Sequence, residues 1–227
     1  MRKWIPVIIV TLIAVIGGVL AVTYEAPEFI IFLFNQKVDQ ELFNPNSKVG
    51  NMKEEILNEL QPVIIELIYE GQTYDQSSNL TEVFATFNEI NEKLTIYVQD
   101  TIPEINEFIE ELNFDPIEQK VNSLVEEHQL LAKALIQSQQ ERLELLLTLN
   151  TQLEQLEEIL SDFNVMFYHT ERPSQSIVYF QSIVYLLEEI ETIHNDYVRV
   201  TDAYQQAKTD YYLILINMGL KEYFFGH

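Results

Sequence analysis

The stretch that decides the fold runs from Phe163 to Leu187 and reads FNVMFYHTERPSQSIVYFQSIVYLL. Pro173 lacks the amide hydrogen that a continuing helix needs, although it suits the first turn of a new helix. The residues on both sides of it are mostly apolar, and the only formally charged ones are Glu171 and Arg172. The stretch therefore predicts a turn between two helices, with an apolar tip.

A heptad repeat of apolar residues follows this turn and predicts a helix over residues 174–221. Its positions recur every seven residues without a fault, which indicates coiled-coil packing against the preceding helix or another chain. One series comprises Ile183, Ile190, Tyr197, Tyr204, Tyr211 and Met218, and the other comprises Leu186, Ile193, Val200, Ala207 and Ile214.

The helix before the turn is predicted over residues 115–168. Asp115 suits the cap and Pro116 the first helical position, and no Gly or Pro follows until the turn. In the second half Leu146, Leu153 and Leu160 alternate with Leu149, Leu156 and Phe163. In the first half, Val121, His128 and Leu135 also recur every seven residues, but their heptad frame is shifted by four residues from that of the Leu146 series. An offset of four predicts a stutter between Ser138 and Leu143.

Two further helices are predicted upstream, over residues 48–70 and 80–113. Their apolar residues advance by three or four, and a polar loop separates them. Pro62 should kink the first helix, and Pro103 should kink or break the second near Thr101. No stretch has a convincing strand pattern. The predicted fold class is therefore all-α, an elongated up-down bundle over residues 46–227 that contains a long antiparallel coiled-coil hairpin.

The first 24 residues have the composition of a transmembrane anchor or a signal segment. Arg2 and Lys3 precede an uncharged run that is long enough to span a bilayer, whereas the small residue Ala21 suits signal cleavage. The charges place the N-terminus in the cytoplasm and the bulk outside, at the periplasm or cell surface, or secreted after cleavage. The apolar anchor positions are Trp4, Ile5, Val7, Ile8, Ile9, Leu12, Ile13, Ile16 and Leu20.

Residues 25–45 contain an apolar aromatic patch, APEFIIFLFNQKV, that is too short to span a membrane alone. This predicts a juxtamembrane amphipathic segment, which either lies along the interface or extends the first helix. The last residues, EYFFGH, suit the headgroup level of a membrane, or they pack on the bundle as a frayed end.

Composition and motifs limit the classes of partner and of chemistry that we expect for this chain. The formal net charge of −23 disfavours nucleic acid and anionic lipid as partners, and the chain contains no cysteine. The only motif of metal-binding type runs from Glu191 to His194, and di-iron bundles need a second copy that the sequence lacks. We therefore expect no catalysis, no metal and no cofactor.

The apolar tip suggests a scaffold or accessory subunit that binds a protein partner through the hairpin. The predicted contact residues are Phe163, Met166, Phe167, Tyr168, Ile177, Val178, Phe180, Ile183 and Val184. Alternatively, helices 48–70 and 80–113 cover the tip, or it inserts into lipid. Two other functions remain open: a ligand-sensing helical bundle, and a self-assembling surface filament or envelope-bridging coiled coil.

Overall fold

The structure is a computed structural model, and it describes residues 26–43, 62–63, 79–169 and 173–217. The chain divides into two compact units. Unit 1 comprises Met1–Asp39, Asn113–Gln139 and Ala203–His227, and unit 2 comprises Gln40–Leu112 and Gln140–Asp202. Two long helices pass through both units, which are described separately below.

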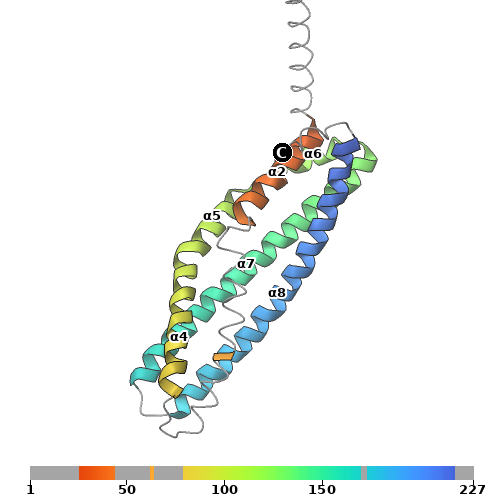
Figure 1. Cartoon of the computed structure of the whole chain (residues 1–227). Coiled ribbons are helices and arrows are strands. Elements are labelled where there is room, and N and C mark those ends of the chain that lie inside the picture. The colour runs from red at the N-terminus through yellow and green to blue at the C-terminus, as the bar shows by residue number, and fades with distance from the viewer. Residues whose placement is uncertain (1–25, 44–61, 64–78, 170–172, 218–227) are drawn as a thin grey trace, which may run out of the picture. The chain divides into compact units, whose positions relative to one another are not determined.

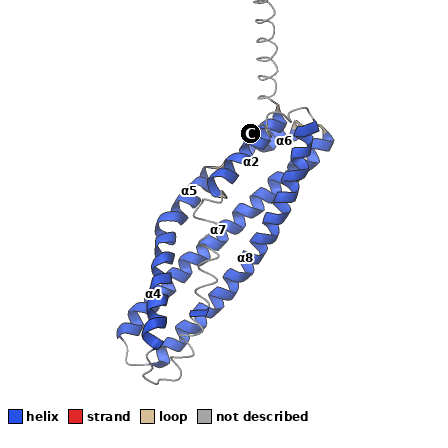
Figure 2. Cartoon of the chain, in the orientation of Figure 1, coloured by secondary structure: helices blue, strands red, loops and turns tan. Residues whose placement is uncertain are grey.

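The described residues are helical apart from short connections, and none of them forms a strand (Figure 2). This confirms the predicted all-α class. The helices in chain order are α2 (Pro27–Leu42), α4 (Asn79–Ile96), a π-helical turn η1 (Tyr97–Thr101), α5 (Ile102–Glu111), α6 (Asp115–Asn122), α7 (Glu126–His169) and α8 (Pro173–Leu215) (Figure 1). Of the predicted helix 48–70, only residues 62 and 63 are described, and both are helical.

The predicted helix over residues 80–113 is confirmed together with its interruption. Instead of a simple kink, the chain forms the π-helical turn η1 immediately before α5. Pro103 lies in the first turn of α5, where its missing amide hydrogen costs no intrahelical bond. The interruption near Thr101 therefore has the position and the cause that the sequence predicts.

The single helix predicted over residues 115–168 is wrong, because the chain breaks between α6 and α7. The Ser123 hydroxyl donates to the Lys120 carbonyl at 2.7 Å, which is a local alternative to helical continuation. α7 then starts with Glu126 and Glu127, whose charges suit a helix N-terminus. Asp115 is also the first helical residue rather than the cap, and its amide donates to the Asn113 side chain at 3.0 Å.

The predicted stutter in α7 is also wrong, since both heptad series are buried without interruption. One series is Ala132, Gln139, Leu146, Leu153 and Leu160, and the other is Leu135, Arg142, Leu149, Leu156 and Phe163. Gln139 and Arg142 occupy core positions of these two series. The sequence suggested a change of heptad frame because these two core residues are polar and interrupt the apolar pattern.

The heptad seam of α8 is confirmed over its described part. Every predicted seam residue from Ile183 to Ile214 is buried or half-buried. Met218 and the rest of the predicted helix lie outside the described residues.

Unit 2 has a core of leucine layers. Residues of α4, α7 and α8 meet in it, among them Leu94, Leu153 and Ile190. Leu149 and Ile190 belong to this one cluster, although 41 residues of straight helix would separate them by about 60 Å. Within unit 2, α7 and α8 therefore fold back on each other around the Pro173 turn.

Unit 1 has a core rich in aromatic residues, in which α2 packs against α6, α7 and α8. Ile31 and Val38 of α2 are completely buried. The Phe32 ring lies 4.7 Å from the Tyr212 ring, and the Phe34 ring lies 5.0 Å from the Phe114 ring. α2 is thus a core helix of unit 1, a role that the sequence did not predict for residues 25–45.

The predicted anchor residues, Trp4 to Leu20, lie outside the described residues, as does the C-terminal EYFFGH. Among the helices that the structure describes, none combines the length and the apolar character that a membrane crossing requires.

Candidate functional site

The predicted hairpin tip is described only in part. Phe163 and Ile183 are each 1% exposed and belong to the core of unit 2, and the Phe163 ring packs edge-on against Phe87 of α4 at 5.7 Å. Val184 is half-buried. Two of the nine predicted contact residues thus pack inside their own chain. The side chains of the other six, Met166, Phe167, Tyr168, Ile177, Val178 and Phe180, lie outside the described set.

The first polar cluster of unit 1 surrounds Glu28 at the start of α2. His128 Nδ1 lies 3.0 Å from the Glu28 carboxylate, and both side chains are largely buried. The Tyr211 hydroxyl donates to the Glu28 backbone carbonyl at 3.0 Å. This cluster ties the first turn of α2 to the first turn of α7 and the end of α8.

The second polar cluster of unit 1 surrounds Asp39, about three turns further along α2. Its Oδ2 accepts a hydrogen bond from the Tyr204 hydroxyl at 2.8 Å and one from Lys208 Nζ at 2.6 Å. Lys208 also lies 5.5 Å from the centre of the Tyr212 ring. Hydrogen bonds to charged groups each contribute about 1.5–3 kcal/mol, so Asp39 is a strong attachment point for α2.

Burial and nearby charges raise the pKa values of Tyr211 and Tyr212 in unit 1. Burial raises the pKa of Tyr211 far above its usual range, and the charges of Glu28 and Tyr212 raise it further. Burial also raises the pKa of Tyr212, with a further contribution from Asp39. Tyr211 therefore keeps its proton, and remains a hydrogen-bond donor, at neutral pH.

Unit 2 has polar contacts between helices inside a mainly apolar interior. Asn150 is completely buried on α7, and its Nδ2 donates to Asn106 Oδ1 of α5 at 3.2 Å. The Thr95 hydroxyl of α4 donates to the Glu157 carboxylate of α7 at 2.8 Å. These bonds fix the register of α4 and α5 against α7.

The buried cation of unit 2 is Arg142, which is only 1% exposed. Its guanidinium carbon lies 3.7 Å from the centre of the Phe43 ring, and the Phe43 ring lies 6.5 Å from the Tyr197 ring. A cation this close to an aromatic face is attracted by the ring quadrupole. A polar residue at a core position of a heptad seam costs stability and selects one alignment of the helices.

Tyr97 begins the π-helical turn and is completely buried. Its hydroxyl has no hydrogen-bond partner among the residues that the structure describes. Burial, followed by the charge of Tyr197, raises the pKa of Tyr97 far above its usual range. Tyr97 therefore adds a neutral hydroxyl to the interior of unit 2.

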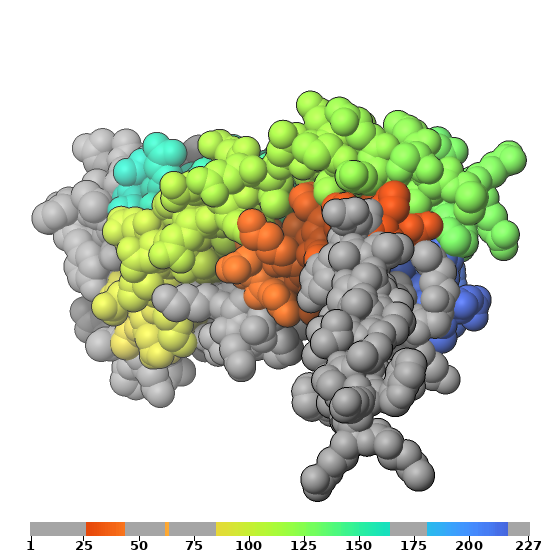
Figure 3. All heavy atoms as spheres, turned by 90° about the horizontal axis from the view of Figure 1, so that it is seen from above, coloured from red at the N-terminus to blue at the C-terminus, as the bar shows by residue number. Residues whose placement is uncertain are grey.

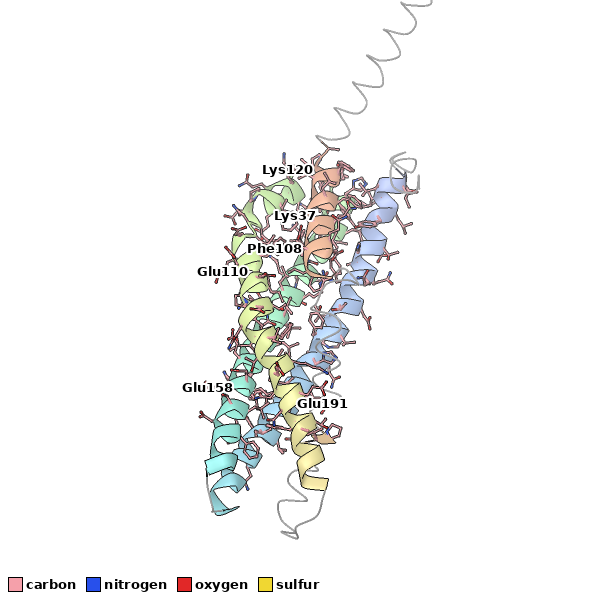
Figure 4. The ribbon with its side chains drawn as sticks, turned by 60° about the vertical axis from the view of Figure 1, so that its left-hand side comes forward. Lys37, Phe108, Glu110, Lys120, Glu158 and Glu191 are labelled. Carbon is pink, nitrogen blue, oxygen red and sulfur yellow. The ribbon has the colours of Figure 1, made fainter. Side chains whose placement is uncertain are left out.

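The described residues contain no group of three or more His, Cys, Asp or Glu side chains that could hold a metal ion. In the Glu191 to His194 motif, Glu191 is exposed and His194 is half-buried (Figure 4). His128, the other histidine of the two long helices whose side chain is described, contacts Glu28 of α2.

Sequence patterns did not reveal the residues that these clusters depend on. Arg142 was visible as a residue seven positions after Leu135 and seven before Leu149, and continuing that series would have placed it in the core. Glu28 and Asp39 stand out as acids in an apolar segment. Their partners could not be found in this way, because Glu28 and His128 are 100 residues apart.

The chain has no match among protein-family models, curated proteins or solved structures. Its function is therefore inferred from the geometry above.

Proposed function

We propose that this protein is a membrane-anchored, extracytoplasmic helical scaffold or accessory subunit that binds a protein partner through its α7/α8 hairpin and catalyses no reaction. The observation that carries the proposal is the hairpin itself. α7 and α8 are 44 and 43 residues long, only three residues separate them, and each contributes to the core of both units. Such a framework suits the presentation of a surface.

The surface chemistry supports a protein partner rather than a nucleic acid. The chain carries a net charge of −23, and acidic residues such as Glu158 of α7 and Glu191 of α8 are exposed in unit 2 (Figure 4). A surface of this sign repels phosphate and attracts a basic partner at a rate that falls with added salt.

The six tip residues with undescribed side chains define the proposed contact. Phe163 and Ile183 are left out, because a side chain in the core cannot contact a partner without opening unit 2. The half-buried Val184 stays at the edge of the proposed contact. The N-terminal anchor is part of the same proposal, and its basis is the apolar run of residues 4–24.

The test is partner capture from detergent-solubilised membranes with the tagged full chain. We expect the double variant Phe167→Asp with Phe180→Asp to lose the partner while keeping its helical circular dichroism. The matched control is Gln155→Asp with Gln205→Asp, which adds the same two negative charges at exposed positions of α7 and α8 away from the tip. Undiminished capture by the aspartate variant would refute the tip as the contact.

A second candidate is a ligand-sensing helical bundle. It is favoured by polar side chains at buried positions of unit 2, namely Asn150, Arg142 and Tyr97. Ligand sites in bundles are built from such side chains on facing helices. A saturable rise in melting temperature with a panel of small carboxylates and amines would favour this candidate, provided that Asn150→Leu abolished the rise.

A further inference from the structure

Two exposed apolar side chains flank the first turn of α7 in unit 1. Val125 is 63% exposed and Leu130 is 72% exposed, which makes Leu130 the most exposed of the large apolar side chains that the structure describes. A single exposed leucine is ordinary on a protein surface. The location of this pair, rather than its exposure alone, indicates a role.

The pair flanks, in the sequence, the residue by which α7 contacts the start of α2. His128 stands between Val125 and Leu130 in the sequence, and its Nδ1 is 3.0 Å from the carboxylate of Glu28 in the first turn of α2. α2 starts at Pro27. Figure 3 shows the orange atoms of α2 next to green atoms, a colour that includes α6 and the first part of α7.

The chain that enters at this point is strongly apolar. Residues 4–24 carry no formal charge, and only Glu25 and Ala26 separate them from α2. A linker of two residues reaches about 7 Å at most, so the start of α2 must stay close to any bilayer that holds the run. Because Glu28 contacts His128, the first turn of α7 must also stay close to that bilayer.

We propose that Val125 and Leu130 rest in the interfacial layer of the bilayer that holds the N-terminal segment, so that this end of unit 1 is a membrane-contacting surface. The inference rests on the proposed anchor. The contact is shallow, because Glu126 and Glu127 are exposed between the two apolar residues and must remain in the headgroup water.

The lipid that fits is zwitterionic. Glu126 and Glu127 lie at the contact and the chain carries a net charge of −23, so an anionic headgroup layer repels this end. Lys120, in the last turn of α6, provides one positive charge in the same unit (Figure 4). We therefore expect phosphatidylcholine to be preferred over phosphatidylglycerol.

The test uses the absence of cysteine from the chain, which allows one fluorescent label per variant. Val125→Cys and Leu130→Cys are labelled with an environment-sensitive dye in the full chain, which is reconstituted in phosphatidylcholine nanodiscs. Lipids that carry a spin label near the headgroup quench a dye in the interface. The matched control is Gln137→Cys, which is exposed one heptad beyond Leu130 on the same helix.

We expect quenching at residues 125 and 130 to exceed that at residue 137 at least twofold, and the excess to shrink when half of the lipid is phosphatidylglycerol. Equal quenching at the three positions would overturn the inference. A dye at Leu12→Cys, read with a deep spin label, separates the two proposals. If the dye at residue 12 is quenched and the dyes at residues 125 and 130 are not, only the proposed contact of unit 1 with the membrane is refuted. If the dye at residue 12 is not quenched, both the proposed anchor and the proposed contact are refuted.

Discussion

The two units use the same pair of helices but fasten their remaining helices in different ways. In unit 1, α2 has 16 residues, and charged or hydroxyl groups around Glu28 and Asp39 tie it to α7 and α8. In unit 2, α4 packs mainly through apolar side chains, and its Thr95 donates one hydrogen bond to Glu157 of α7. The neutral pair Asn106 and Asn150 joins α5 to α7.

Helix length does not explain this difference, because α2 has 16 residues and α4 has 18. Helices in proteins draw most of their stability from tertiary packing. In unit 1 a few strong polar bonds add to the apolar contacts of α2, whereas unit 2 relies more on apolar contacts, each worth about 1.5–3 kcal/mol for a fully buried side chain. Unit 1 should therefore be sensitive to single polar substitutions as well as to cavities, and unit 2 mainly to cavities.

The largest effect should come from cavities in the two cores. Leu156→Ala in unit 2 and Leu135→Ala in unit 1 each remove a completely buried side chain. Each should lower the free energy of unfolding by about 2–5 kcal/mol, measured by urea denaturation. Leu130→Ala, at an exposed position of α7, should change it by less than about 0.5 kcal/mol. A loss for Leu156→Ala no larger than for Leu130→Ala would contradict the core of unit 2.

The next effect should come from Asp39→Asn, which removes the charge that Tyr204 and Lys208 contact. We expect a loss of about 1–3 kcal/mol, together with faster amide hydrogen exchange in α2 and little change in α4. The matched control is Asp202→Asn, an exposed acid of α8. If exchange in α2 were unchanged, Asp39 would not be its attachment point.

In unit 2 the contact between Arg142 and Phe43 should be measurable by a double-mutant cycle. Phe43→Leu and Arg142→Met should show a coupling of about 1–2 kcal/mol, because the cation is desolvated above the ring. The cycle is needed because the Arg142 substitution alone also changes other contacts. A second cycle with Arg199→Met, whose guanidinium is exposed, should give a coupling near zero.

A smaller effect, with opposite signs in the two units, is expected for buried tyrosine hydroxyls. Tyr211→Phe breaks the bond to the Glu28 carbonyl and should destabilise by about 1 kcal/mol. Tyr97→Phe removes a buried hydroxyl without a partner among the described residues, so it should be neutral or stabilise by about 1 kcal/mol. Equal losses for both variants would mean that Tyr97 is bonded as Tyr211 is.

The smallest effect at ordinary pH is the response of these tyrosines to alkali. The folded-state pKa values of Tyr97, Tyr211 and Tyr212 are raised. Their contribution to stability is complete below the unfolded value of about 10 and is lost as pH rises towards the folded values. Absorbance at 295 nm should show at least three of the 12 tyrosines ionising only on unfolding. Tyr211→Phe should reduce that number by one.

The sequence by itself determined the helical class, the turn at Pro173, the interruption near Pro103 and the buried seam of α8. These features depend on residues within one or two turns of each other: a proline acts on its own turn, and a heptad repeat fixes which face of a helix is buried.

Only the tertiary structure decided that α2 is a core helix, that Glu28 and Asp39 hold it, and that Arg142 belongs to the seam. Asp39 and Lys208 are 169 residues apart, and no local pattern indicates that they meet. At the break after α6, the Ser123 hydroxyl and the amides of Ser123 and Leu124 all bond to carbonyls three residues back or within that turn, a local choice that the heptad pattern does not indicate. Periodicity shows which residues face inward, whereas packing selects the residues that they contact.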